Sequence, residues 1–185
     1  MSGTRLPKWA QLNVRQMPEE GLQIEDELPA DLWTGAEEGI LLAAPLAVAL
    51  ACVKRGDRVE VEGRLRGAAR MECARCLRPV DVPIDAPVHA LYMPGDPTED
   101  DVAISSKDEE DVYFGWYEPP DLDLLDEVRQ VAVVSLPHRA LCSEGCRGLC
   151  PSCGADLNEE TCSCEAEPGD TRWDKLREFR NKLKE

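Results

Sequence analysis

Apolar and polar residues alternate through much of the first half of the chain. The segment RVEVEGRLRG (58–67) places valine and leucine among charged neighbours at a period of two, which is typical of a strand with one buried face. The apolar run LAVALACV (46–53) precedes it, and the turn-like sequence KRGD separates the two. We therefore expect a twisted antiparallel sheet of several strands within residues 1–93.

A third segment of this region also alternates, but it contains prolines. The sequence VDVPIDAPVHALYM (80–93) is interrupted by Pro83 and Pro87. Proline has no backbone N–H to donate to a neighbouring strand, so it is confined to sheet edges and bulges. The sequence predicts an edge strand or a bulged strand here.

A strongly acidic segment follows, from residue 94 to residue 120. It carries nine acidic residues and one lysine, and like charges at this density repel one another. We expect much of the segment to be mobile. Its aromatic cluster is the exception, because these rings either cover the open edge of the sheet or form a docking patch for a partner. The cluster consists of Tyr113, Phe114, Trp116 and Tyr117.

Helical periodicity is found in two segments in the last third of the chain. Residues 121–136 begin with Asp121 in the N-cap position and end before Pro137, which cannot continue a helix. Residues 170–185 form a second predicted helix, which begins with a sequence resembling a capping box. The apolar stripes that predict these helices are Leu125, Val128 and Ala132 in the first and Trp173, Leu176, Phe179 and Leu183 in the second.

The charge of the chain limits how it can meet nucleic acid. Its 21 basic and 37 acidic residues give a formal net charge of −16, so it does not coat nucleic acid over its whole surface. Residues 54–78 reverse the balance, with eight basic and four acidic residues. This stretch is either an ordinary solvated face or an RNA-facing strand surface, with the acidic segment turned toward a basic ribosomal protein. The candidate RNA-binding residues are Arg58, Arg64, Arg66, Arg70, Arg75 and Arg78.

Targeting signals are not evident at the start of the chain. The sequence MSGTRLPKWAQLNV lacks the apolar core of a secretory signal and the Arg/Ser-rich amphipathic character of a transit peptide. The longest apolar run, residues 40–53, contains Pro45 and is too short to cross a bilayer of about 30 Å as a helix. We expect a cytoplasmic protein with no membrane partner.

Nine cysteines carry the most specific chemical signal in the sequence. Cys52 lies alone in an apolar strand and is predicted to be a small buried hydrophobic side chain. The other eight form four closely spaced pairs, and two sets of four thiolates are what two tetrahedral zinc sites require. Gly154, which follows the motif CPSC, suits the positive φ that closes a zinc knuckle. The pairs are Cys73/Cys76, Cys142/Cys146, Cys150/Cys153 and Cys162/Cys164.

Disulfides and thiol-redox chemistry are the two alternatives to zinc at these cysteines. Disulfides need an oxidising compartment, which the expected cytoplasmic setting does not provide. A redox site of the C-x-x-C type needs a helix that begins within the motif and lowers the thiol pKa. The sequences LRP and GADLNEE that follow the two C-x-x-C motifs disfavour such a helix. We therefore predict structural Zn²⁺.

The spacing of the pairs suggests how they combine. The two pairs between Cys150 and Cys164 are neighbours in the sequence and form one compact predicted site. The two remaining pairs then form a second site, which would pin the hairpin around Cys73 to the segment that follows the first helix. The metal at this second site would close a long loop that contains the acidic segment.

These elements predict an α+β protein. Its parts are a twisted antiparallel sheet in the N-terminal half, one central helix, a C-terminal zinc-knuckle segment and a terminal helix. We divide the chain into an antiparallel β region with a C-x-x-C hairpin (1–93), an acidic segment (94–120) and a helical and Cys-rich region (121–185). We expect one domain with an appended zinc segment rather than separate domains.

Five stretches of the chain, taken in order, resemble the YceD family. They are MECARCL (71–77), DLDLLDEVRQVAVVSLP (121–137), LCSEGCRGLCPSCGADLN (141–158), CSC (162–164) and DTRWDKL (170–176). The resemblance implies a role in the accumulation of large-subunit ribosomal RNA, hence in ribosome biogenesis, with no established enzymatic activity. It implies as partner the large-subunit ribosomal RNA or its precursor particle.

The resemblance is incomplete at one position, because the family usually carries Glu where this chain has Gln130. The residues themselves give no support to catalysis, since His89 and His138 are the only histidines and neither lies in a nucleophile motif. Two other functions remain open. One is a zinc-stabilised adaptor that binds a basic ribosomal protein through the acidic and aromatic segment, and the other is a thiol-redox protein.

Overall fold

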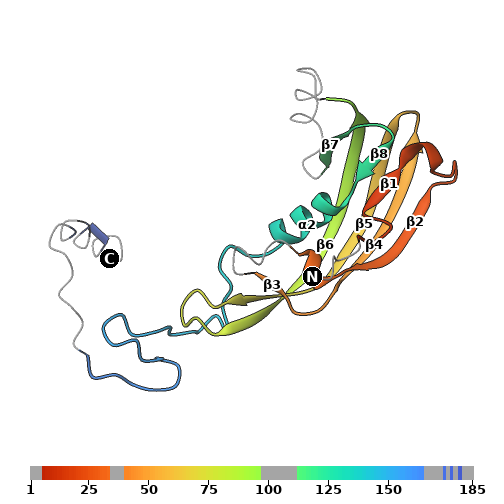
Figure 1. The fold of residues 1–185 in the computed structure, drawn as a ribbon. Coiled ribbons are helices and arrows are strands. Elements are labelled where there is room, and N and C mark those ends of the chain that lie inside the picture. The colour runs from red at the N-terminus through yellow and green to blue at the C-terminus, as the bar shows by residue number, and fades with distance from the viewer. Residues whose placement is uncertain are drawn as a thin grey trace.

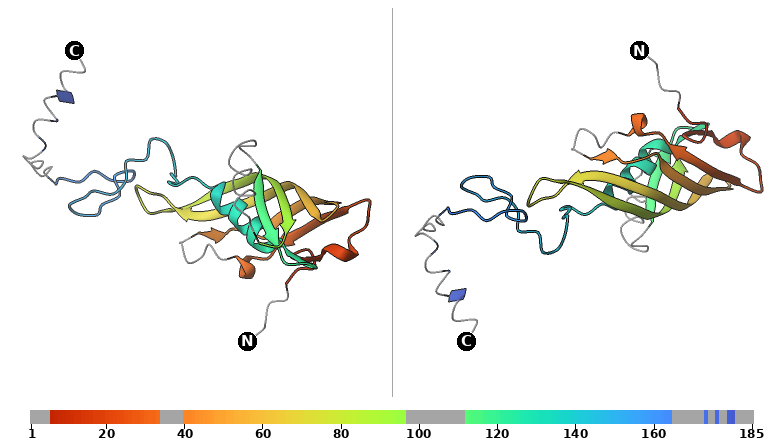
Figure 2. Two further views of the ribbon diagram at one scale, coloured as in Figure 1. Left: turned by 90° about the horizontal axis from the view of Figure 1, so that it is seen from above. Right: turned by 90° about the horizontal axis from the view of Figure 1, so that it is seen from below.

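The chain folds around a twisted, curved sheet, one face of which carries the helix α2 (Leu125–Val134) (Figure 1). The Cys-rich segment extends beyond the sheet, next to the turn of its longest hairpin (Figure 2). The computed structural model describes residues 6–33, 40–96 and 112–164, together with Trp173, Leu176, Phe179 and Arg180.

The main sheet has six strands in the order β2-β4-β5-β6-β7, with β3 paired to β5, and a separate two-stranded sheet pairs β1 with β8. The described elements are β1 (Gln11–Asn13), the 3₁₀ turns Val14–Gln16 and Ala30–Leu32, β2 (Leu22–Leu28), β3 (Leu41–Leu42), β4 (Leu46–Arg55), β5 (Arg58–Glu72), β6 (Pro79–Pro94), β7 (Tyr113–Tyr117), β8 (Asp121–Asp123) and α2 (Leu125–Val134).

The core lies between α2 and the facing side of the main sheet. Buried residues alternate along β4, β5 and β6, as the period-two pattern predicts. Gly63 and Gly67 interrupt the buried row of β5 for a steric reason. A Cβ at Gly63 would lie 2.1 Å from the carbonyl oxygen of Ala49, and a Cβ at Gly67 would lie 2.8 Å from Cδ1 of Leu46. The two glycines therefore let the backbone and a leucine of β4 approach β5 closely.

The strand β6 is an edge strand over most of its length. It pairs with β5 in one continuous antiparallel register from Glu72↔Pro79 to Val59↔Tyr92, so the bulge that we considered does not form. Three of its four prolines stand four residues apart, at positions 79, 83 and 87, which places their nitrogens on one side of the strand. That side is the open edge, because the pairing with β5 passes all three without interruption.

The antiparallel sheet predicted within residues 1–93 is confirmed, but a strand from outside that range makes the whole sheet mixed. β7 lies parallel to β6, from Ala90↔Tyr113 to Pro94↔Tyr117, and makes the sheet mixed. A parallel neighbour requires a long return connection, and residues 95–112 supply it. The aromatic cluster is this strand, and it covers the last part of the open edge of β6. The predicted mobility of the acidic segment falls on residues 97–111, which lie outside the described residues.

The first predicted helix forms, but its N-cap is Leu124 rather than Asp121, three residues later than expected. Asp121 belongs to β8, whose pairing with β1 holds the chain in an extended conformation. The carboxylate of Asp123 accepts a hydrogen bond of 2.8 Å from the N–H of Leu125 at the start of α2. The structure buries Leu125, Val128 and Ala132, so the predicted apolar stripe of the helix is confirmed.

The second predicted helix, residues 170–185, lies largely outside the described residues. Leu176, Phe179 and Arg180 are helical, and Leu176 and Phe179 expose 57% and 61% of their surface. The described ranges contain no helix long and apolar enough to span a bilayer. The boundaries proposed for the three regions of the chain stay a prediction.

Candidate metal centres

The first cysteine quartet joins two distant parts of the chain. Cys73 and Cys76 lie in the turn between β5 and β6, and Cys142 and Cys146 lie in the segment after α2. The Sγ atoms of Cys73 and Cys146 are 3.8 Å apart, and those of Cys76 and Cys142 are 3.7 Å apart. Four thiolates around one tetrahedral Zn²⁺, with bonds of about 2.3 Å, are separated from one another by about 3.8 Å. The quartet therefore has the dimensions of a ZnS₄ site.

Backbone hydrogen bonds shape the turn that carries Cys73. Its carbonyl accepts a bond of 2.9 Å from the N–H of Leu77, and its own N–H donates to the carbonyl of Arg78 at 2.8 Å. Leu77 closes the turn with a φ of 59°, in the left-handed region. The turn is fixed against the segment after α2 by a bond of 2.8 Å from the N–H of Ala74 to the carbonyl of Ala140.

The second cysteine quartet consists of Cys150, Cys153, Cys162 and Cys164, and its sulfur atoms lie within 4.8 Å of one another. The turn at Cys150 repeats the first one, because Gly154 N–H donates to the carbonyl of Cys150 at 2.9 Å and Gly154 has a φ of 76°. The positive φ predicted at Gly154 is confirmed. Cys153 and Cys164 are exposed in this quartet, whereas only Cys142 is exposed in the first.

The ionisation of the thiols differs within each quartet. The backbone N–H of Cys142 is the largest of several contacts that lower the pKa of Cys73 to about 6. The N–H of Cys153 acts in the same way on Cys150, whose pKa also falls to about 6. The neighbouring thiol of Cys153, together with burial, raises the pKa of Cys164 to about 12. Each quartet therefore readily provides one thiolate, and full ionisation requires a cation.

Disulfides do not link these residues. All nine cysteines are free, and the sulfur separations of 3.7 and 3.8 Å far exceed the S–S bond length of about 2.05 Å. Cys52 is fully buried in the core, as predicted, and burial raises its pKa to about 11.

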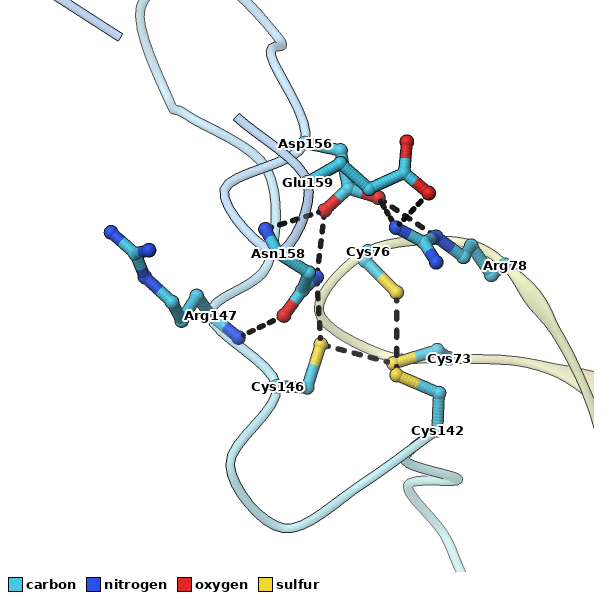
Figure 3. A network of polar contacts seen from close by, with 9 residues as sticks. All are labelled: Cys73, Cys76, Arg78, Cys142, Cys146, Arg147, Asp156, Asn158 and Glu159. Atoms are coloured by element: carbon cyan, nitrogen blue, oxygen red, sulfur yellow. Dashed lines mark hydrogen bonds and ion pairs between the residues drawn. The ribbon is translucent and has the colours of Figure 1, made fainter. Parts of the chain in front are cut away.

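The two quartets are connected by a polar network (Figure 3). The side-chain N–H of Asn158, from the loop of the second quartet, donates to Sγ of Cys146 in the first at 3.5 Å. Arg78, which follows the first turn, donates from Nε to Asp156 at 2.8 Å and forms an ion pair of 3.0 Å with Glu159. The loop that the second quartet closes is thus held against the first quartet.

The candidate RNA-binding arginines fall into two groups. Arg75 and Arg78 are part of the Cys-rich segment, where Arg75 donates to the carbonyls of Glu144 at 3.0 Å and Cys146 at 2.8 Å. The other four, Arg58, Arg64, Arg66 and Arg70, stand at alternate positions of β5 on the face that points away from α2.

Carboxylates of the neighbouring strand accompany the arginines of β5. Arg64 and Arg66 both pair with Asp85, and Arg70 pairs with Asp81 at 2.7 Å. These partners lie on β6, directly across the ladder from Arg66 and Arg70 and two positions along it from Arg64. The count of charges between residues 54 and 78 missed them because they lie just beyond that range, on the returning strand. The period-two alternation of β6 was the signal that could have located them on the same face.

Comparison with known proteins places the chain near one family. A family model described as "Large ribosomal RNA subunit accumulation protein YceD" matches residues 61–180, a range that includes both cysteine quartets. No solved structure matches the chain.

Three relatives illustrate the similarity. A protein of Arabidopsis thaliana named "Large ribosomal RNA subunit accumulation protein YCED homolog 1, chloroplastic" is 22% identical over 76% of this chain and 50% of its own length. The protein of the same name in Zea mays is 25% identical over 67% of this chain and 49% of its own length. An uncharacterized protein of Mycobacterium tuberculosis is 32% identical over 77% of this chain and 64% of its own length. The chain thus spans about half the length of its plant relatives.

Proposed function

Because the chain belongs to the YceD family of large ribosomal RNA subunit accumulation proteins, we propose that it is a non-catalytic ribosome biogenesis factor. In this role it supports the accumulation or stability of large-subunit ribosomal RNA in the cytoplasm. The observation that carries the proposal is the family match over residues 61–180, together with the plant relatives that bear the same name.

Depletion of the protein in its own organism tests this function. We expect the ratio of large-subunit to small-subunit ribosomal RNA to fall, and to recover when the wild-type chain is expressed again. A normal ratio in the depleted cells would refute the proposal.

We propose further that each cysteine quartet holds one structural Zn²⁺. The first quartet supports this with sulfur separations of 3.7 and 3.8 Å, and the second repeats its turn geometry. A bound Zn²⁺ would offset half of the negative charge of four thiolates and, in the first quartet, would join the β5–β6 turn to the segment after α2. Purified protein should contain close to two zinc ions per chain, measured by elemental analysis. Purified protein whose Cys-rich segment is ordered without metal would contradict the assignment.

The arginines of β5 are the proposed contact with RNA or with its precursor particle. Their ion pairs with Asp81 and Asp85 leave them exposed, since the side chains of Arg66 and Arg70 are 71% and 52% accessible. Surface pairs of this kind are worth only about 0–1 kcal/mol, so phosphate can replace the carboxylates.

A charge-reversal pair tests this surface. The double substitution Arg64→Glu with Arg66→Glu should reduce co-sedimentation with ribosomal precursors, and wild-type association should weaken as salt rises. The control Lys8→Glu with Arg15→Glu changes the net charge equally at exposed residues elsewhere. Equal loss in both variants, or loss in neither, would favour instead the adaptor that binds a basic ribosomal protein.

A further inference from the structure

A groove of about 480 Å³ lies between α2 and the open edge of β6, next to the first residue of β7. Its wall is mostly apolar, and the polar side chains of Glu127, His89, Gln130 and Ser135 also line it. The residues that matter here are Ala86, Pro87, Tyr113, Glu127, Val131 and Val134.

Glu127 is the unusual residue of this groove. It is the one charged side chain in the core of the described chain, with 5% of its surface exposed, and its Oε2 atom has no hydrogen-bond partner. No basic side chain of the described ranges forms an ion pair with it. An unpaired carboxylate in such a position is costly, so the groove has an unmet need for a donor or a cation.

The surroundings of Glu127 suit a long cationic side chain. Val131 and Val134 on α2 and Pro87 on β6 provide apolar surface for a methylene stem. The ring of Tyr113 is 41% exposed and is held edge-on against Tyr92, with the centroids 6.2 Å apart. An aromatic face beside a carboxylate is a favourable place for a guanidinium or an ammonium group.

We infer that this groove binds an arginine or lysine side chain presented by a basic segment of a partner protein. Glu127 supplies the countercharge, and Tyr113 and the valines of α2 enclose the stem. The net charge of −16 favours a basic partner, whereas the carboxylate repels the phosphates of RNA. The occupant is therefore a protein segment, in contrast to the RNA proposed for the opposite face of the sheet.

This inference goes beyond the proposed function, because it adds a protein contact on another surface. A test with purified components needs no ribosomes. Its failure would remove the groove as a binding site and would leave the proposed role in ribosomal RNA accumulation in place.

The probe is the peptide acetyl-Gly-Leu-Arg-Leu-Gly-amide, and its control is the same peptide with the uncharged isostere citrulline. Titration followed by methyl NMR should shift the signals of Val131 and Val134 with the arginine peptide. We expect affinity for the citrulline peptide to be at least about tenfold lower, because a desolvated charge pair is lost. Equal affinities, or shifts confined to residues outside the groove, would overturn the inference.

Two variants locate the site. Glu127→Gln should lower the affinity for the arginine peptide about tenfold or more. Glu19→Gln makes the same charge change at an exposed residue and should leave this affinity unchanged. Val134→Lys is a second variant that keeps Glu127, and it should fold because Val134 is 76% exposed. Its ammonium group at the groove should compete with the peptide and lower the affinity. Unchanged binding in Val134→Lys or in Glu127→Gln would refute the site.

Discussion

Leu77 and Gly154 occupy the same place in two copies of one turn, but only one of them suits its backbone. Both have positive φ values, 59° and 76°, and both donate their N–H to the carbonyl of the first cysteine of a C-x-x-C motif. The left-handed conformation costs a residue with a Cβ about 1–2 kcal/mol, whereas glycine adopts it freely. The first turn therefore carries a strain that the second lacks.

One substitution in each turn should measure that strain. Leu77→Gly should leave the free energy of unfolding unchanged or raise it by about 1 kcal/mol, although it removes a large side chain, because 57% of that side chain is already exposed. Gly154→Ala should weaken the second turn by about 1–2 kcal/mol. A Cβ there meets nothing within 4 Å, so its cost is purely conformational. Chemical denaturation and rates of metal release measure both effects, and a marked loss in Leu77→Gly would show that its side chain has another role.

Glu127 makes stability depend on pH. Burial raises its pKa from 4.5 to about 7, so the folded protein binds a proton that the unfolded chain releases. The stabilisation is complete below the unfolded pKa and is lost as the pH rises through 7. The variant Glu127→Gln does not titrate, so its free energy of unfolding relative to wild type should rise by roughly 1–2 kcal/mol as the pH increases from 5 to 8. This range is smaller than the full pKa shift implies because solvent in the groove screens the charge. Denaturation of both proteins at each pH measures this, and a pH-independent difference would contradict it.

The connection between the quartets is the main feature at the scale of elements. The loop between Cys153 and Cys162 supplies Asn158 to Cys146 and receives Arg78 from the β5–β6 turn (Figure 3). N–H···S hydrogen bonds to a metal-bound thiolate orient the ligand and tune its basicity. The order of one site thus supports the other.

Asn158→Ala tests that connection. Although residue 158 belongs to the loop of the second quartet, we expect the variant to lose metal from the first quartet about 10–100-fold more readily, the usual range for partners of a metal ligand. Competition with a chelator, followed by the absorption of cobalt(II) bound to thiolates, measures the metal affinity of the site directly. Glu160→Ala is the control, since its side chain is exposed in the same loop. Equal metal release from both variants would show that the contact has no influence.

The sequence predicted the elements that depend on local pattern and missed those that depend on distant partners. The alternation of β4, β5 and β6 and the buried stripe of α2 follow from periodicity, and the grouping of the cysteine pairs follows from their spacing. The predicted start of α2 was wrong because Asp121 pairs with Asn13 of β1 and is held in a strand. The direction of β7 depends on a return connection that periodicity does not encode.

At the scale of the whole molecule, the first quartet joins the sheet to the Cys-rich segment. The β5–β6 hairpin is held by its own ladder up to Glu72↔Pro79, so the sheet does not need metal to form. The segment from Ala140 to Leu149 depends instead on contacts with the hairpin turn, including the bond of 3.0 Å from the N–H of Leu149 to the carbonyl of Arg75. The metal is therefore expected to hold this segment in place.

Cysteine substitutions should separate the two sites. Cys73→Ser should lower cooperative thermal stability more than Cys150→Ser, because its partners lie about seventy residues away and close a long loop. Hydrogen exchange should rise in residues 138–148 for Cys73→Ser but only in residues 150–164 for Cys150→Ser. Protection of residues 138–148 in Cys73→Ser would show that the first quartet is not a metal site.

The prolines of β6 also bear on how the protein behaves at high concentration. An unpaired strand edge is normally a template onto which another copy can add a strand, the first step toward domain swapping and amyloid. With positions 79, 83 and 87 lacking N–H groups, the edge of β6 offers carbonyls but an incomplete row of donors. A second copy therefore finds no continuous ladder over residues 79–87, and this part of the hairpin that carries Cys73 and Cys76 is protected from self-association.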